Sequence, residues 1–124
     1  VVRSARAGPL LAGSFVCASA TARYIQRLEP RQVTMVVTGT QLGVSGDEDA
    51  ALADYLEALL NSERPDPAPY LARVRAAVPG LAALHAGLYD ILTADVEHCV
   101  AIDRFDFAML VERQHGLLVM KAVR

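Results

Sequence analysis

The stretch from residue 33 to residue 60 constrains the fold most, because it reads as a strand, a glycine turn and a helix in direct succession. Residues 33–37 form an apolar run without alternation, which is typical of a strand covered on both faces. Ser45, followed three residues later by Glu48, predicts a capping box at the start of the helix. The apolar stripe of this helix is formed by Leu52, Tyr55, Leu56, Leu59 and Leu60. A glycine turn between a strand and a helix is a common ligand-binding place in α/β proteins.

The flanking segments predict further elements on both sides of this stretch. Residues 9–12 suggest a short strand, and residues 18–28 predict a helix that ends before Pro30. Pro69 suits the first position of a later helix, and Pro79-Gly80 is expected to break it before a short helix over residues 81–88. A helix that returns to a buried strand predicts an α/β fold, a layered sheet with packed helices.

The last third of the chain predicts one more helix and a hairpin. Thr93 can cap a short helix in which Val96, Cys99 and Val100 point inward. Two β-type runs follow, residues 107–112 and 117–123, and the four residues between them include Gly116. Glycine supplies the positive φ that tight hairpin turns need, so the pattern predicts an antiparallel pair.

The bulk properties limit the classes of partner. A chain of 124 residues with 53% hydrophobic residues is one domain, or part of a larger one, with a sizeable core. The net charge of −2 gives no reason to expect nucleic acid or an anionic membrane as partner, and no apolar run approaches the roughly 20 residues of a membrane span. Cys17 and Cys99 have no metal-type spacing and are expected to be buried thiols in a reducing cytoplasm.

Three acids, Asp47, Glu48 and Asp49, stand at the start of the predicted helix after residue 46. In the simpler interpretation they only complement the positive end of the helix dipole, at about 0.3–1 kcal/mol each. In the other interpretation a divalent cation sits between these acids and a phosphate group that the glycine turn attracts. Mg²⁺ suits such a place, since it takes one or two carboxylates together with substrate phosphate oxygens.

Two other segments can carry chemistry. Asp103, Arg104 and Asp106 precede a predicted strand and could bind an anionic substrate or a metal; a salt-bridged turn is the equal alternative. Ser14, after Gly13, could present backbone N–H groups to an anion, although helix capping is the simpler role for it. The three histidines show no metal-binding spacing.

These segments, in this order, resemble the 2-phosphosulfolactate phosphatase (ComB-like) family of coenzyme M biosynthesis. Residues 13–20 (Gly-Ser-Phe-Val-Cys-Ala-Ser-Ala) are similar to its Gly-Ser-Phe-x-Asn-Ala-x-Ala segment. Residues 39–49 resemble its Gly-Thr…Gly…Ser-x-Glu-Asp segment. Residues 95–99 and 103–106 resemble its closing Asp-Ile-x-x-Cys…Asp-Arg-Tyr-Asp signature, the most specific of the three.

The resemblance implies a cytoplasmic, Mg²⁺-dependent phosphatase that hydrolyses the phosphate ester of 2-phosphosulfolactate or a similar small phosphorylated acid. It assigns metal binding to Glu48, Asp49 and Asp106, and catalysis to Glu48, Asp49 and Asp103. Arg104, Ser14 and Thr40 are then expected to contact the substrate. Self-association into a homodimer is left open.

The chain also departs from the family pattern. Cys17 replaces the family's Asn, the turn after Thr40 is one residue longer, and Val44 stands near the place of a usual Arg. The family's Asp-Val-x-Arg-Ala-Thr and Thr-Asn-Gly-Thr segments are not found here. The chain is therefore expected to correspond to the C-terminal half of a larger α/β fold, with part of the site outside it. The alternative function is a non-catalytic domain that kept the fold and binds a small molecule or a partner.

Overall fold

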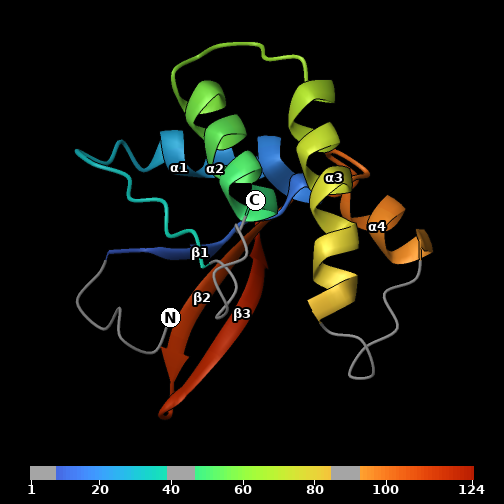
Figure 1. Ribbon diagram of the computed structural model, residues 1–124. Helices are drawn as coiled ribbons and strands as arrows, with labels where there is room; N and C mark the ends of the chain where they lie inside the picture. The colour runs from blue at the N-terminus through green and yellow to red at the C-terminus, as the bar shows by residue number, and fades with distance from the viewer. Residues whose placement is uncertain (1–7, 39–46, 85–92) are drawn as a thin grey trace.

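The computed structural model describes residues 8–38, 47–84 and 93–124, which form a mixed α/β structure of helices packed beside a small sheet (Figure 1). In chain order the elements are β1 (Leu10–Ala12), the 3₁₀ helix η1 (Phe15–Cys17), α1 (Ala18–Arg27), α2 (Asp47–Leu60), α3 (Ala68–Leu84), α4 (Thr93–Cys99), β2 (Ala108–Gln114) and β3 (Leu117–Val123). The expected combination of a sheet with packed helices is confirmed at this level.

The sheet is antiparallel, with the strand order β1-β2-β3. The three residues of β1 pair with residues 109–111 of β2, so that Leu11 lies opposite Leu110. β2 and β3 form the predicted hairpin, but β2 continues to Gln114 and the turn has two residues rather than four. Those residues, His115 and Gly116, both have positive φ values, 50° and 82°, as a type I′ turn requires. The predicted strand near residue 10 is confirmed as well.

The buried strand predicted for residues 33–37 is wrong. The segment forms no strand, and Val36 and Val37 are 75% and 46% exposed. Met35 is the residue of this run that packs, partly buried, against the core. β-branched residues favour a strand only where a neighbouring strand takes up their hydrogen bonds. None of the described strands pairs with this segment.

α1 and α2 follow the predicted helices closely. α1 ends at Arg27, and Glu29, the residue before Pro30, has a left-handed φ of 45°. In the apolar stripe of α2, Tyr55 and Leu56 are buried, while Leu52, Leu59 and Leu60 pack partly buried against the core. Ser45, the predicted N-cap, lies outside the described residues.

The expected break at Pro79-Gly80 is wrong, because α3 runs through both residues to Leu84. Proline removes one backbone hydrogen bond from a helix, but the turns before it are held by the buried Leu71 and Val74. Residues 81–84 therefore belong to α3 and not to the separate short helix predicted for residues 81–88, and residues 85–92 lie outside the description.

α4 is found where Thr93 predicted it, with Val96 partly buried and Val100 buried at its end. Cys99 is exposed, which corrects the expectation that it points inward, since a helix of seven residues buries only one narrow side. Cys17 is fully buried, and both cysteines are free thiols.

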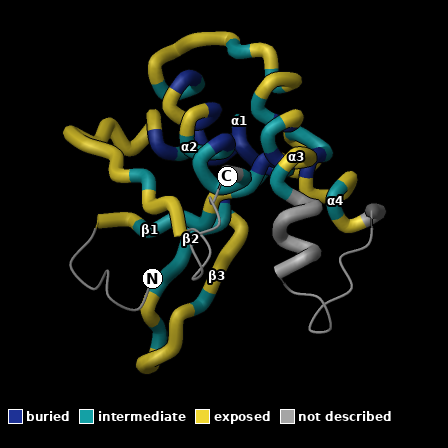
Figure 2. Tube along the Cα trace, in the orientation of Figure 1, coloured by how far each residue is buried: buried dark blue, intermediate teal, exposed yellow. Residues whose placement is uncertain are grey.

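The core lies where η1, α1, α2 and α3 meet (Figure 2). Its centre is the ring of Tyr55, whose centroid lies 5.7 Å from that of Phe15 and 5.2 Å from that of Tyr70. The far end of the hairpin extends away from the helices; β3 is largely exposed, whereas most of β2 is half-buried and its first residue, Ala108, is buried. Within the described residues, no helix combines the length and the apolar character that crossing a membrane would need.

Candidate functional site

The segment of residues 103–106, between α4 and β2, is bonded to the start of α1. The backbone N–H of Asp103 donates to the carbonyl of Phe15 at 3.0 Å, and the N–H of Phe105 donates to the carbonyl of Val16 at 2.8 Å. Asp103 has a left-handed φ of 51°, a conformation in which Asp is several-fold enriched among non-glycine residues. The two segments with family-like motifs at residues 13–20 and 103–106 therefore meet.

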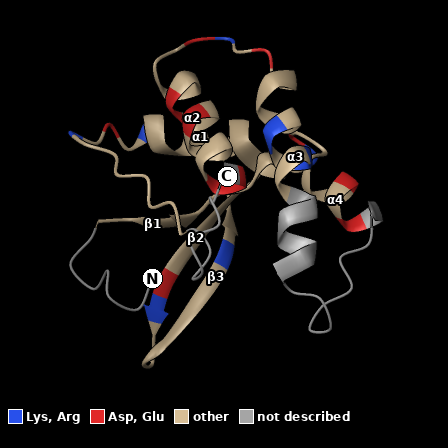
Figure 3. Ribbon diagram, viewed as in Figure 1, with Lys and Arg blue, Asp and Glu red and all other residues tan. Residues whose placement is uncertain are grey.

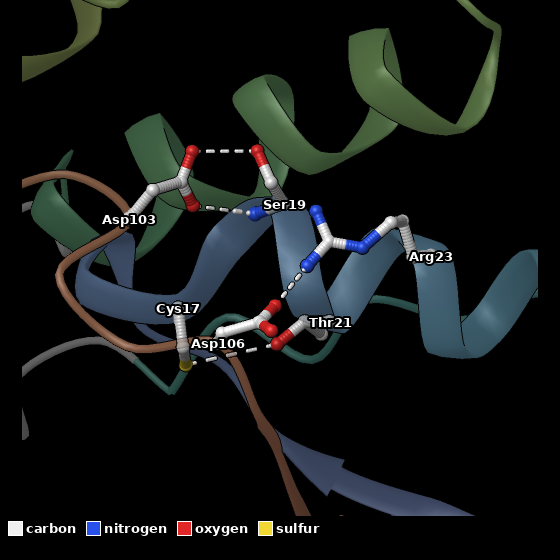
Figure 4. Close-up of polar contacts among 6 residues, drawn as sticks. All are labelled: Cys17, Ser19, Thr21, Arg23, Asp103 and Asp106. Carbon is white, nitrogen blue, oxygen red and sulfur yellow. Dashed lines mark hydrogen bonds and ion pairs between the residues drawn. The ribbon is translucent and has the colours of Figure 1, made fainter. Parts of the chain in front are cut away.

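Asp103 caps α1 from a distant part of the sequence (Figure 4). Its Oδ1 accepts a hydrogen bond from the backbone N–H of Ser19 at 2.7 Å, and its Oδ2 accepts one from the Ser19 hydroxyl at 2.5 Å. Cys17, the local N-cap residue, makes no side-chain capping bond. The carboxylate thus satisfies an N–H group at the helix start and lies at the positive end of the helix dipole.

Arg23, one turn further along α1 than Ser19, donates from Nη2 to Oδ1 of Asp106 and forms an ion pair with it. Figure 4 shows the other terminal nitrogen of Arg23 pointing away from Asp106. The two side chains are 57% and 79% exposed, so solvent screens the pair. The ion pair nevertheless orients the Arg23 guanidinium, one turn of α1 away from the Ser19 side chain that Asp103 binds.

These contacts surround a shallow hollow of about 240 Å³. Its lining residues are Ser19, Ala20, Arg23, Asp103, Phe105 and Asp106. A hydroxyl, two carboxylates and a guanidinium therefore border one open space, next to the exposed ring of Phe105. A larger hollow of about 380 Å³ lies between residues 30–35 and the end of α2, and none of the predicted site residues that the structure describes lines it.

The negative charge of Asp103, at this site, acts on the hydroxyl of Tyr55, which lies in the core. Burial of its ring, which leaves 5% exposed, raises the pKa of the Tyr55 hydroxyl above 10, and the negative charge of Asp103 raises it further. The hydroxyl therefore stays neutral at physiological pH. Figure 3 shows acidic and basic residues on both the helices and the strands of the described chain.

The start of α2 holds the other predicted acids. Asp49 accepts hydrogen bonds at Oδ2 from the backbone N–H of Thr38 at 3.2 Å and from its hydroxyl at 2.5 Å. Oε2 of Glu48 is buried and has no hydrogen-bond partner among the described residues. An orphaned buried oxygen is costly, and a donor or a cation would satisfy it. The described part of the chain contains no group of three or more metal-ligating side chains.

The structure thus brings some predicted site residues together and leaves others apart. Asp103 and Asp106 border the same hollow, whereas the described side chains of Glu48, Asp49 and Arg104 do not line it. Ser14 makes no side-chain cap bond, and its carbonyl accepts from the N–H of Cys17 at 3.2 Å. Thr40 lies outside the described residues.

The sequence analysis missed Ser19 and Arg23, which supply the α1 side of the hollow. Their spacing of four residues places them on one helix face, and the absence of a capping side chain at Cys17 was a signal that an acceptor comes from elsewhere. No family model matches the chain, and no curated protein or solved structure is significantly similar to it.

Proposed function

We propose that the chain contributes binding and catalytic residues to a Mg²⁺-dependent phosphatase that hydrolyses 2-phosphosulfolactate or a similar small phosphorylated acid. The observation that carries the proposal is the meeting of residues 13–20 with residues 103–106. Both segments resemble the same family, they are far apart in sequence, and they share one hollow bordered by Ser19, Asp103 and Asp106. The reaction class is taken from the resemblance, and the contacts between the two segments support assigning it to this hollow.

The first family-like segment also contacts α2, the helix whose start contains the described end of the segment at residues 39–49. Gly13 packs against α2 so tightly that an added Cβ would lie 3.2 Å from Cδ2 of Leu52. The start of the same helix carries Glu48 and Asp49. The larger α/β fold that we propose also accounts for the exposed valines of residues 33–37, since a valine-rich segment gains hydrogen bonds when other residues supply a neighbouring strand.

The start of α2 fits a magnesium ion in the sense that the orphaned oxygen of Glu48 needs a partner. Glu48 and Asp49 would hold the ion, in agreement with the one or two carboxylates that Mg²⁺ takes alongside substrate phosphate, whereas Asp106, which the motif also suggested as a ligand, borders the separate hollow beside α1. When bound, the ion would neutralise charge on the phosphoryl group. Asp103, held by its two bonds to Ser19, is the carboxylate of the hollow that can accept a hydrogen bond from an attacking water.

The test is a phosphate-release assay of the whole protein with Mg²⁺ and 2-phosphosulfolactate. Asp103→Asn and Glu48→Gln should each lower kcat/KM by about 100-fold or more, because each removes a charged acceptor. Glu63→Gln, at an exposed acid after α2, is the matched control and should leave the rate unchanged. Absence of turnover on this substrate and on related phosphoacids would refute the proposal.

A second candidate function is a non-catalytic domain that binds a small molecule or a partner. It is favoured by the finding that Asp49, Asp103 and Asp106 each already bond to a neighbouring segment, as structural residues would. Titration of Mg²⁺ into the whole protein separates the two functions. Binding that Glu48→Gln abolishes supports the phosphatase, and no binding supports the non-catalytic domain.

A further inference from the structure

We infer that Arg23, rather than Arg104, binds the anionic group of the ligand in the hollow beside α1. This inference rests on the proposed function for the identity of the ligand, a small phosphorylated acid. It assigns the anion contact to a residue of the first helix instead of the one that the closing motif suggested.

The first argument is position. Arg23 is the one basic residue among the described residues that line the hollow, where it lies with Ser19, Asp103 and Asp106. Arg104 is exposed on the same short segment but is not part of that lining. The backbone N–H groups of Asp103 and Phe105, on either side of Arg104, are bonded to the carbonyls of Phe15 and Val16, which fixes the backbone from which Arg104 projects.

The second argument is the state of the guanidinium. Asp106 engages Nη2 of Arg23, while the other terminal nitrogen points away from Asp106 (Figure 4). Arginine has five N–H donors in a rigid fork that matches phosphate and carboxylate oxygens. Asp106 is therefore a positioning residue, which orients the fork and leaves donors for a ligand.

The third argument is charge. The hollow has two carboxylates and one guanidinium, so its formal charge is negative. The N-terminus of α1 offsets the charge of Asp103, since the carboxylate sits at the positive end of the helix dipole. The charge of Asp106 is offset by its ion pair with Arg23, so neither carboxylate of the hollow is left uncompensated when a phosphate group approaches. Measuring phosphate binding with and without Mg²⁺ then shows whether the proposed cofactor contributes at this hollow.

The test measures binding of inorganic phosphate to the whole protein by calorimetry, with and without Mg²⁺. With Mg²⁺, Arg23→Gln should weaken phosphate binding by about 10- to 100-fold, as expected for loss of charge-assisted hydrogen bonds. Arg23→Lys keeps the charge without the fork and should recover part of the affinity. Arg104→Gln tests the competing assignment and should bind as the unmodified protein does; Arg113→Gln, at an exposed arginine outside the hollow, is the matched control.

Thermal unfolding of the same variants, together with Asp106→Asn, separates ligand binding from a purely structural role. A structural ion pair predicts similar losses of stability for Arg23→Gln and Asp106→Asn, with phosphate affinity unchanged in Arg23→Gln. That result, a larger loss of affinity in Arg104→Gln, or no phosphate binding to the unmodified protein in Mg²⁺ would each overturn the inference. Arg23-dependent phosphate binding without turnover would refute only the phosphatase, and turnover unaffected by Arg23→Gln would refute only the role of Arg23.

Discussion

The segments 103–106 and 33–37 each behave in the opposite way to what their composition suggests. The first is polar and exposed, yet two backbone hydrogen bonds and contacts from Asp103 and Asp106 bond it to η1 and α1. The second is apolar and rich in valine, yet it forms no strand and leaves Val36 three-quarters exposed. Whether one of these two segments is bonded to the rest of the molecule therefore depends more on an available hydrogen-bonding partner than on the hydrophobicity of the segment.

The largest expected effect concerns Tyr55, whose ring packs against Phe15, the residue that binds the backbone of segment 103–106. Tyr55→Ala should lower the free energy of unfolding by about 3–5 kcal/mol, because it removes a buried ring that contacts both Phe15 and Tyr70. Urea denaturation measures the change. Tyr55→Phe keeps the ring and should lower the free energy of unfolding far less. Equal losses in the two variants would show that the Tyr55 hydroxyl, rather than the packing of its ring, supplies this stability.

A smaller effect is expected for the cap itself. Asp103→Ala should lower the free energy of unfolding by about 1–2 kcal/mol, since it leaves the N–H of Ser19 without an acceptor and places alanine at a positive φ. Asp103→Asn keeps an acceptor and tolerates that φ, so its loss should be smaller. Denaturation curves of the two variants measure the difference. If both variants matched the unmodified protein, the contrast between the two segments would lose its energetic basis.

The smallest effect is expected in residues 33–37. Val36→Thr should change the free energy of unfolding by no more than about 0.5 kcal/mol, because the side chain is 75% exposed. The same substitution at the buried Val100 is the control and should cost about 1–3 kcal/mol, since it buries a hydroxyl. A cost at Val36 as large as that at Val100 would mean that residues 33–37 are buried in solution.

Elements with local signals were predictable from sequence. The apolar spacing around Tyr55 marked α2, and Gly116 marked the hairpin turn, because helix periodicity and positive φ depend on neighbouring residues. The strand at residues 33–37 was mispredicted because strand formation depends on a second segment that local composition does not reveal. The continuation of α3 through Pro79 was missed for a related reason, since packing of its preceding turns outweighs one lost bond.

The candidate site was predictable only in part. Asp103 and Asp106 could be chosen from their residue types and motif, and the structure locates both at one hollow. The spacing of Ser19 and Arg23 only shows that they share a helix face, and their contacts to the segment that follows α4 are what single them out. Glu48 keeps an unsatisfied oxygen, a state that depends on the fold and that no sequence pattern reports.

The capping of α1 by Asp103 has a consequence for the order of events during synthesis. Asp103 follows Ser19 by 84 residues, so a ribosome makes the whole of α1 long before it makes the acceptor for that helix start. At about 5–20 residues per second, this interval lasts several seconds. The nascent chain carries α1 uncapped throughout that time, and we expect the helix to reach its final stability only after translation has passed residue 103.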